Sequence, residues 1–345
     1  MDRKLSKIVR VDDVVPIAGA DAIEAAKLGG WTVVVKKAEF KPGDLAIYFE
    51  IDSFLPQGNP AWQFLVDKSS RSYNGVTGHV LRSIKLRGQV SQGLLLPLSI
   101  DVQLATLGSD AIGKDVSDLL GVVKYEPPLA AELAGVARGL FPSRVSKTDQ
   151  ERIQNLALEL DQWVQDGALT WEVTEKLEGA SCTFAWLDDD LHVCSRNIDL
   201  MDAPGNSLWR LARELDIPAK FAAGFAGRNL ALQGEIVGFG IQGNIYGLRT
   251  QQFYLFDVYD ADQARYLTPS ERQVIAQQMG LTQVPVIDSG FSLPSVAAME
   301  SLLAMADGAS ALKADQLREG LVFKANAQSA SFKAVSNKYL LKQSA

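Results

Sequence analysis

Thr174-Glu-Lys-Leu-Glu-Gly-Ala-Ser181 follows directly on a run of β-type residues that begins at Trp171. Lys176 therefore lies at the end of a predicted strand, and Gly179 follows in the loop. A glycine at such a point lets a phosphate or a base approach the backbone closely. A lysine amine acts as a nucleophile only when deprotonated, and desolvation or neighbouring cations make that form accessible at neutral pH. A Lys-x-x-Gly spacing alone is common by chance, so the rest of the chain must decide its meaning.

Five further segments of mixed charged and apolar residues follow in a fixed order. They are Ser195-Arg-Asn197, Leu232-Gln-Gly-Glu235, Phe253-Tyr-Leu-Phe-Asp257, Glu319-Gly-Leu-Val-Phe-Lys324 and Ser331-Phe-Lys333. With the first segment they resemble motifs I, Ia, III, IIIa, IV and V of the covalent nucleotidyltransferases, the superfamily of DNA ligases, RNA ligases and mRNA capping enzymes. All six occur in order between residues 174 and 333. The complete ordered set indicates function where each segment alone does not.

The resemblance implies ATP and a divalent metal, Mg²⁺ or Mn²⁺, as cofactors. Attack on the α-phosphate of ATP needs a nucleophile, a metal on the phosphate oxygens and cations to balance charge. Lys176 would be the nucleophile and would form a lysyl-adenylate. Glu235 and Glu319 would hold the metal, with Glu178 as a third ligand. Position 178 departs from the superfamily motif, which most often has Asp there.

The same resemblance assigns two further lysines to catalysis. Lys324 and Lys333 would contact the α-phosphate. Motif V often reads Lys-x-Lys, but Ser331 stands at the first of these positions here. We therefore expect one phosphate contact to be missing or to come from Lys338.

Other motif residues would bind the nucleotide and the RNA end. Arg196 is expected to act in catalysis with Asn197 by binding the ribose and the incoming 5′-phosphate. Gln154 and Asn155 would help to recognise the nucleotide. The residues next to the nucleophile, namely Glu175, Leu177 and Gly179, are also expected to line the ATP site.

An aromatic side chain of the strand from Phe253 should stack on adenine. Strand alternation puts Phe253 and Leu255 on one face and Tyr254 and Phe256 on the other. We choose Phe253. Burial in the core is the expected role of Tyr254, Phe256 and Asp257 taken singly, because it is the commoner fate of aromatic residues.

The structural alternative applies to the charged residues as well. Glu235 could be an exposed strand acid, with Lys324 and Lys333 as its solvated partners. For these residues, and for Lys176 and Glu319, the ordered set of motifs favours chemistry.

The first part of the chain has a different pattern. From Ile8 to about Leu120, short apolar strands alternate with Gly and Pro, which predicts a small closed β-barrel of OB type. The segment Leu81–Leu96 is similar to part of the tRNA-binding OB modules. Lys85 and Arg87 within it are suited to contact RNA phosphates, and Arg152 is assigned to RNA binding as well.

Three parts are expected from these patterns. They are an OB-fold-like RNA-binding domain over residues 1–123, a linker over 124–147, and an α+β nucleotidyltransferase domain of the ATP-grasp-like ligase type over 148–345. Pro127-Pro128 and several glycines mark the linker. A helix is expected from about Thr148, because Ile153, Leu156, Leu160 and Val164 recur at helical spacing.

The order of the domains resembles one branch of the superfamily. DNA ligases and capping enzymes usually carry an OB domain after motif V, whereas here the predicted barrel comes first. This order resembles the RNA ligases typified by the Naegleria enzyme, which seal a 3′-OH to a 5′-phosphate through a lysyl-adenylate and an adenylylated RNA end. The partner would be RNA with such ends. A DNA nick ligase and a non-catalytic OB-fold RNA-binding protein are the alternatives.

Composition limits the remaining possibilities. The net charge of -7 argues against coating nucleic acid by bulk electrostatics, although a local basic groove is compatible with it. Two cysteines and two histidines are too few for a zinc site of the usual kind. No apolar run reaches the length of a membrane span, and no signal peptide is evident, so we expect a cytoplasmic protein without a membrane partner. No obligate protein partner is evident.

Overall fold

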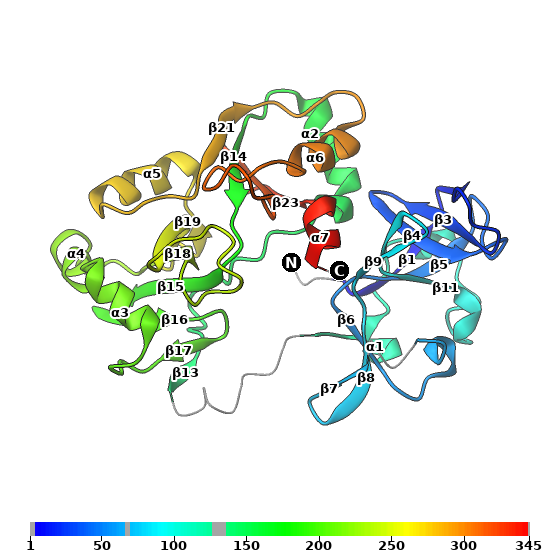
Figure 1. Cartoon of the computed structure of the whole chain (residues 1–345), viewed down its shortest axis with the longest axis horizontal. Coiled ribbons are helices and arrows are strands. Elements are labelled where there is room, and N and C mark those ends of the chain that lie inside the picture. The colour runs from blue at the N-terminus through cyan, green and yellow to red at the C-terminus, as the bar shows by residue number, and fades with distance from the viewer. Residues whose placement is uncertain (1–3, 66–69, 126–135, 344–345) are drawn as a thin grey trace. The chain divides into compact units, whose positions relative to one another are not determined.

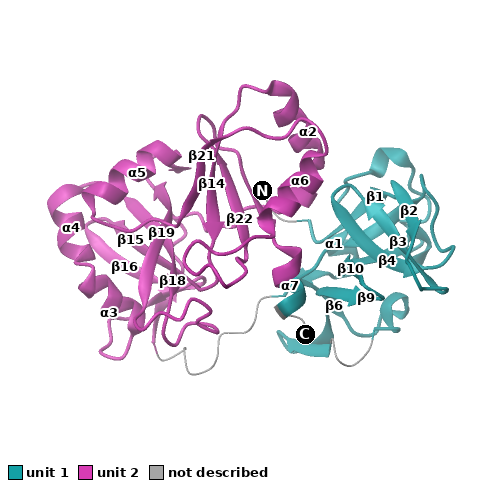
Figure 2. Ribbon diagram, turned by 45° about the horizontal axis from the view of Figure 1, so that its top comes forward, with its two compact units in different colours: residues 1–128, 340–345 teal, residues 129–339 magenta. Residues whose placement is uncertain are grey.

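The computed structural model describes residues 4–65, 70–125 and 136–343 (Figure 1). The chain divides into two compact units (Figure 2). Unit 1 comprises residues 1–128 and 340–345, and unit 2 comprises residues 129–339. Each unit has its own hydrophobic clusters and is described separately below.

Unit 1 is built almost entirely of short antiparallel strands. One sheet has the order β1 (Ser6–Arg10), β5 (Leu45–Phe49), β11 (Leu94–Pro97), and a second has the order β2 (Asp13–Pro16), β3 (Ile23–Leu28), β4 (Trp31–Lys36). A third has the order β12 (Val123–Lys124), β6 (Ser53–Pro56), β8 (Val76–Val80), β7 (Ser70–Tyr73), and β9 (Ser83–Leu86) forms a hairpin with β10 (Gln89–Gln92). One short helix, α1 (Ser117–Leu120), lies between β11 and β12 in the chain.

Strand β5 holds the two cores of unit 1 together. Ile47 and Phe49 belong to one hydrophobic cluster, whereas Ala46 and Tyr48 belong to the other. Successive strand residues point to opposite faces, so both faces of β5 are buried. This explains its continuous apolar sequence, which a half-exposed strand would not have.

Unit 2 contains a seven-stranded antiparallel sheet. Its order is β13 (Ala137–Leu140), β17 (Ile198–Leu200), β16 (Asp190–Cys194), β15 (Ala180–Leu187), β18 (Leu230–Val237), β19 (Gln252–Asp260), β20 (Arg265–Tyr266). The helices α3 (Ser207–Glu214), α4 (Ile217–Gly224) and α5 (Pro269–Gln278) contribute side chains to the hydrophobic cluster on one face of the sheet. The opposite face carries two smaller hydrophobic clusters together with the polar residues described below.

A four-stranded sheet makes up the rest of unit 2. Its order is β21 (Val286–Phe291), β14 (Trp171–Lys176), β22 (Gly320–Ala325), β23 (Ser331–Val335). The helices α2 (Ala157–Asp166) and α6 (Ala298–Ala306) pack on it through the aromatic cluster of Trp163, Trp171, Phe323 and Phe332. The last helix is α7 (Asn337–Gln343). This packing fixes β14, and therefore Lys176 at its end.

Two expected elements differ from the structure. The helix expected from Thr148 begins only at Ala157, after a 3₁₀ turn over Ile153–Asn155, because Leu156 has φ -113° and ψ 34° and interrupts the helical backbone. Within the expected linker, 124–147, residues 126–135 lie outside the described residues. Its later part contains β13, which pairs with β17.

Candidate functional site

Lys176 lies at the last position of β14, as expected, and meets an acid from the neighbouring strand. In the register of β14 and β22 it is opposite Gly320. Glu319 stands just before that glycine, and its Oε1 lies 2.6 Å from Lys176 Nζ. A Cβ at Gly320 would come within 2.3 Å of the carbonyl oxygen of Ala334, so only glycine lets β23 pack this closely. The two candidate groups thus meet at the ends of paired strands.

Glu235 joins them from the seven-stranded sheet. On β18 it is opposite Ser181 of β15 and Tyr254 of β19, and its side chain is partly buried. Burial raises the pKa of Glu235 to about 7; Lys176 opposes this rise and Glu319 adds to it. The structure therefore brings together a lysine and two carboxylates that come from three separate motifs.

Gly179 allows the loop after Lys176 to lie directly on β18. A Cβ at Gly179 would be 2.2 Å from the carbonyl oxygen of Ile236 and 2.8 Å from Glu235 Cγ. The next loop reinforces this contact, because Gln242 Nε2 donates to the carbonyl of Gly179 at 3.2 Å. The glycine of motif I is thus required by close packing as well as by any ligand.

Two cations, Lys333 and Arg196, contact Asp149 near Lys176. Lys333 Nζ lies 3.0 Å from Asp149 Oδ1, and Arg196 Nη2 lies 3.5 Å from Asp149 Oδ2. Burial lowers the pKa of the Lys333 ammonium; Asp149 opposes this, and nearby Lys176 and Arg152 add to it. Arg152 Nη1 is buried and has no hydrogen-bond partner among the described residues. The structure therefore places Arg152 beside the expected phosphate ligands.

The side chains expected to recognise the nucleotide differ in their hydrogen-bond partners. Gln154 is 3% exposed, and its Oε1 accepts no hydrogen bond from the described part of the chain. Asn155 Nδ2 donates to Glu151 Oε1 at 2.8 Å. Asn197 Oδ1 accepts from Lys147 Nζ at 2.9 Å. Gln154 thus presents a buried acceptor that a bound base could satisfy.

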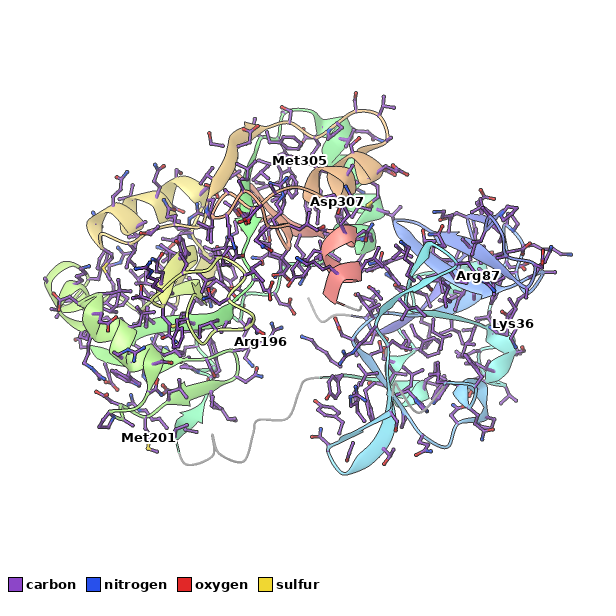
Figure 3. All side chains as sticks on the ribbon, viewed as in Figure 1. Lys36, Arg87, Arg196, Met201, Met305 and Asp307 are labelled. Carbon is purple, nitrogen blue, oxygen red and sulfur yellow. The ribbon has the colours of Figure 1, made fainter. Side chains whose placement is uncertain are left out.

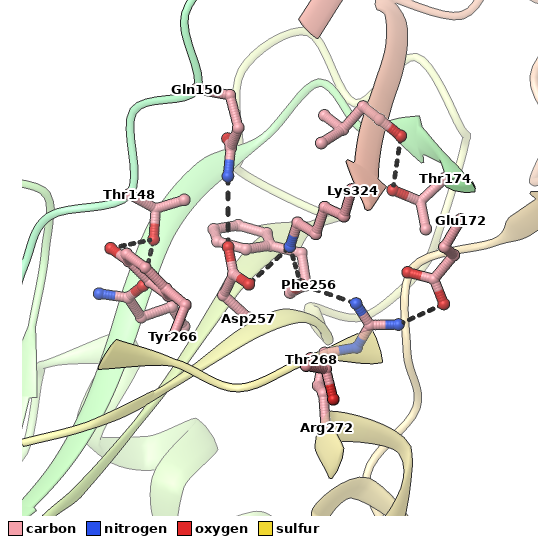
Figure 4. Close-up of polar contacts among 12 residues, drawn as sticks. Thr148, Gln150, Glu172, Thr174, Phe256, Asp257, Tyr266, Thr268, Arg272 and Lys324 are labelled. Carbon is pink, nitrogen blue, oxygen red and sulfur yellow. Dashed lines mark hydrogen bonds and ion pairs between the residues drawn. The ribbon is translucent and has the colours of Figure 1, made fainter. Parts of the chain in front are cut away.

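Lys324 is fixed by a buried polar network (Figure 4). Its Nζ lies 2.6 Å from Asp257 Oδ1 and donates to the carbonyl of Phe256 at 2.5 Å. Gln150 Nε2 donates to Asp257 Oδ2 at 3.2 Å. Burial lowers the pKa of Lys324, and Asp257 is the largest opposing influence. The ammonium is therefore desolvated and held by one carboxylate.

Arg272 extends this network to helix α5 (Figure 4). It is 1% exposed, and its Nη1 donates to the carbonyl of Phe256 at 3.3 Å. Its Nη2 lies 2.8 Å from Glu172 Oε2, and Glu172 is opposite Lys324 in the register of β14 and β22. The carbonyl of Phe256 thus links the buried pair Arg272–Glu172 to Lys324.

A β-bulge makes this network possible. Gln233 pairs with Asp257 and Gly234 pairs with Leu255, so Phe256 is an extra residue in β19. The bulge puts Asp257 on the same face as Tyr254, although strict alternation would separate them. It also frees the Phe256 carbonyl for Lys324 and Arg272. Asp257 is buried, as expected, but it also pairs with Lys324, which the sequence did not indicate because the register shift was not visible in it.

The choice of Phe253 for stacking on adenine needs correction. Phe253 is 5% exposed, and its ring lies 4.9 Å from that of Phe184 in the hydrophobic cluster of the seven-stranded sheet. A Cβ at Gly234 would be 2.4 Å from the Phe253 ring, so this ring fills the space left by the glycine. Phe253 therefore lies on the face opposite Glu235. The face of Glu235 carries Tyr254 and Phe256 instead.

The two residues next to the nucleophile, Leu177 and Glu175, contact different parts of unit 2. Leu177 packs with Tyr246 and Tyr254 in a small cluster on the side of Glu235. Glu175 is turned elsewhere: its Oε2 accepts from the backbone N–H of Ala311 at 2.7 Å, and burial raises its pKa. Its carboxylate therefore serves the loop at residue 311.

The described side chains supply two of the expected metal ligands at one place. Among residues 4–65, 70–125 and 136–343, no three acidic, histidine or cysteine side chains gather closely enough to form a metal site by themselves. Glu178 is not grouped with Glu235 and Glu319; its backbone N–H donates to Tyr246 Oη at 2.7 Å. Two carboxylates still suit Mg²⁺ or Mn²⁺, which commonly take the other ligands from water and substrate phosphates.

The two basic residues expected in unit 1 lie on an exposed hairpin. Lys85 belongs to β9, and Arg87 forms the turn to β10 with Gly88 (Figure 3). Arg87 has φ 48° and Gly88 has φ 86°, so both turn residues are left-handed, as a tight hairpin requires. Both side chains are exposed.

Several residues of the site were missed from the sequence. Asp149 fell at the start of the helix expected from about Thr148, and Gln150, Glu172, Arg272 and Tyr246 were not singled out. The available signal for Glu172 was a charged residue inside an otherwise buried strand, which needs a partner. No comparable signal marked Arg272 on its helix.

Comparisons with known proteins agree with this architecture. Residues 5–98 match an OB-fold domain family, and residues 169–339 match the RNA ligase family. The chain is similar to the apo form of an aspartate-to-alanine mutant of Naegleria gruberi RNA ligase, with 45% identity, a TM-score of 0.88 and coverage of 99% of this chain and 98% of that chain. A lysine-to-alanine mutant of that ligase with ATP and Mn matches at 45% identity, a TM-score of 0.87 and 98% of each chain. The ligase with PPi matches at 45% identity, a TM-score of 0.87 and 99% of each chain. No curated protein matches.

An OB-fold domain followed by this ligase domain is the architecture of a nucleotidyltransferase. The chain belongs to the RNA ligase family, as its identity over nearly the full length shows. The expected fold class and family are thereby confirmed. The described residues contain no helix long and apolar enough to cross a membrane.

Proposed function

We propose that this protein is an ATP-dependent RNA ligase that joins a 3′-OH to a 5′-phosphate through a lysyl-adenylate on Lys176 and an adenylylated RNA end. The observation that carries the proposal is the contact of 2.6 Å between Lys176 Nζ and Glu319, with Glu235 beside them. The related Naegleria ligase has been solved with ATP and Mn and with AMP and Mn. The same compounds suit the groups found here.

In the first step Lys176 attacks the α-phosphate of ATP. A nitrogen–phosphorus bond forms, the bond to the pyrophosphate oxygen breaks, and pyrophosphate leaves. Glu319 Oε1 is placed to take the proton of the amine, since the two atoms already lie 2.6 Å apart.

Glu235 and Glu319 would hold the divalent cation, Mg²⁺ or Mn²⁺. Their oxygen donors fit a hard cation. Burial raises the pKa of Glu235 to about 7, and a bound cation would stabilise the charged carboxylate that burial disfavours. When bound, the metal would polarise the phosphate oxygens. We do not include Glu178 in this set, because the structure does not group it with the other two carboxylates.

The cations around the site would bind the phosphates. Lys333 and Arg196 hold Asp149 in this structure, and an anionic phosphate would compete for the same donors. Lys324 would contact the α-phosphate from its fixed position beside Asp257. Preorganised charges of this kind stabilise the transition state more than mobile surface charges do.

For the base we propose Phe256 as the stacking ring in place of Phe253. Phe256 is partly buried beside Leu177 and Tyr246, on the face of the sheet that carries Glu235. The unsatisfied Oε1 of Gln154 would accept a hydrogen bond from the exocyclic amino group of adenine. Lys85 and Arg87 of unit 1 would contact RNA phosphates without reading sequence.

Sealing assays with defined ends test the proposal. Purified protein with ATP and Mn²⁺ should join RNA that carries 3′-OH and 5′-phosphate ends, and should leave 3′-phosphate and 5′-OH ends unjoined. Nicked duplexes with RNA or DNA on the 3′-OH side distinguish an RNA ligase from a DNA nick ligase, and Lys176→Ala is the control. Equal sealing of both nicks would reject the proposed specificity for RNA. Sealing by Lys176→Ala would reject the proposed nucleophile.

A further inference from the structure

Phe239 is the most exposed aromatic side chain among the described residues. Its exposed fraction is 71%, in the loop of residues 238–251 between β18 and β19. Gly238 with φ 119° and Gly240 with φ 75° stand on either side of it. A Phe side chain held in water forgoes the stabilisation that burial would give. This exposure leaves the ring accessible to a ligand.

The loop that carries Phe239 is firmly attached to the active site. The two ends of the loop lie close together, because a Cβ at Gly238 would be 2.1 Å from the carbonyl oxygen of Thr250. Gln251 Nε2 donates to the carbonyl of Phe239 at 3.1 Å. Gln242 of the same loop donates to the carbonyl of Gly179, three residues after Lys176. The exposed ring therefore belongs to a held surface that continues into the site.

Cations accompany the ring. Arg249 is exposed in the same loop. Arg210 of α3 donates to Gln251 Oε1 at 3.1 Å and also lies 3.6 Å from Glu214. Gln251 thus links Arg210 to the backbone of Phe239. A loop that carries an exposed ring and exposed guanidinium groups suits a ligand that offers both flat rings and phosphates, which is nucleic acid.

We propose that Phe239 stacks on an unpaired nucleobase of the RNA beside the ends being joined, with Arg249 on a neighbouring phosphate. The proposal rests on the RNA ligase function proposed above and adds a substrate contact to it. The base of ATP is a separate ligand, because its expected pocket at Phe256 lies within the partly buried cluster. Every base has an aromatic face, so this contact would hold RNA without reading its sequence.

Phe239→Ala tests the contact without removing a buried group. Stacking on one base is worth enough to predict a rise in the KM for RNA of between about fivefold and a hundredfold. Labelling of Lys176 by ATP should stay within about twofold of the parent, because the ring touches no residue of that step. Phe239→Trp should keep the parent KM. Val296→Ala is the matched control, since Val296 is 79% exposed in the same unit.

An RNA series with one abasic nucleotide identifies the base. The abasic position is moved through the nucleotides on both sides of the junction, and the KM is measured for the parent and for Phe239→Ala. At the contacted position the abasic nucleotide should raise the KM of the parent to about that of Phe239→Ala. The KM of Phe239→Ala should not rise further at that position. Equal losses for both proteins at every position, parent-like sealing by Phe239→Ala, or an equal loss in Val296→Ala would overturn the contact. Failure of the parent to label with ATP would instead overturn the proposed function.

Discussion

Asp257→Asn should make Lys324 lose its charge at a lower pH. Asp257 Oδ1 lies 2.6 Å from Lys324 Nζ, and it is the largest influence that raises the lysine pKa against burial. Asparagine keeps the size of the side chain and removes the negative charge. The buried ammonium would then keep the carbonyl of Phe256 as its neutral acceptor.

The size of the effect follows from the contact. A nearby opposite charge typically shifts a pKa by about 1–3 units, which corresponds to about 1.4–4 kcal/mol. In the proposed mechanism the positive form of Lys324 binds the α-phosphate, so activity should fall as pH rises through its pKa. Lowering that pKa moves the descending limb of the pH profile to lower pH by about 1–3 units. Activity at low pH, where Lys324 is charged in both proteins, should change much less.

The assay is the single-turnover rate of AMP transfer to the protein, measured across pH with saturating ATP and metal. Asp260→Asn is the control, since Asp260 is a buried acid of the same strand that pairs with Arg228 at 3.5 Å. The control should keep the parent profile. An unchanged descending limb in Asp257→Asn, or an equal shift in the control, would show that Lys324 does not act as the charged group.

Two other predictions concern the metal and the division of labour between the units. Glu235→Gln and Glu319→Gln should each lower AMP transfer by on the order of a hundredfold or more at an unchanged melting temperature, and near-parent rates would make them ordinary acids. A fragment of residues 129–345, which contains unit 2, should still accept AMP but seal RNA poorly, with a deficit that grows with salt. Sealing equal to that of the full chain, or a folded fragment that cannot accept AMP, would contradict this division.

The sequence predicted the site where chemistry constrains residue type. Lys176, Glu319 and Glu235 come from segments far apart in the chain, and the structure brings them together. Their spacing alone carried little information, but their order within one superfamily pattern did. The positions of strands β14 and β19 were also predictable, because each is a clear run of β-type residues.

Local irregularities were not predictable in the same way. The extra residue at Phe256 reverses the side of Asp257, and nothing in a strand of alternating residues reveals a bulge. The packing of Phe253 against Gly234 depends on a partner strand that the sequence does not identify. Asp is a common residue at the start of a helix. The helix begins later than expected, however, and the carboxylate of Asp149 forms ion pairs with Lys333 and Arg196. Each of these differences arises from tertiary contacts.

The most direct test of the account is the covalent adduct on Lys176. Protein incubated with ATP and Mn²⁺ is analysed by intact mass and then by peptide mapping. The account predicts one added AMP on the peptide that contains Lys176, its absence in Lys176→Ala, and its release on addition of pyrophosphate. An AMP on another residue, or an adduct that persists in Lys176→Ala, would contradict the assignment of the nucleophile.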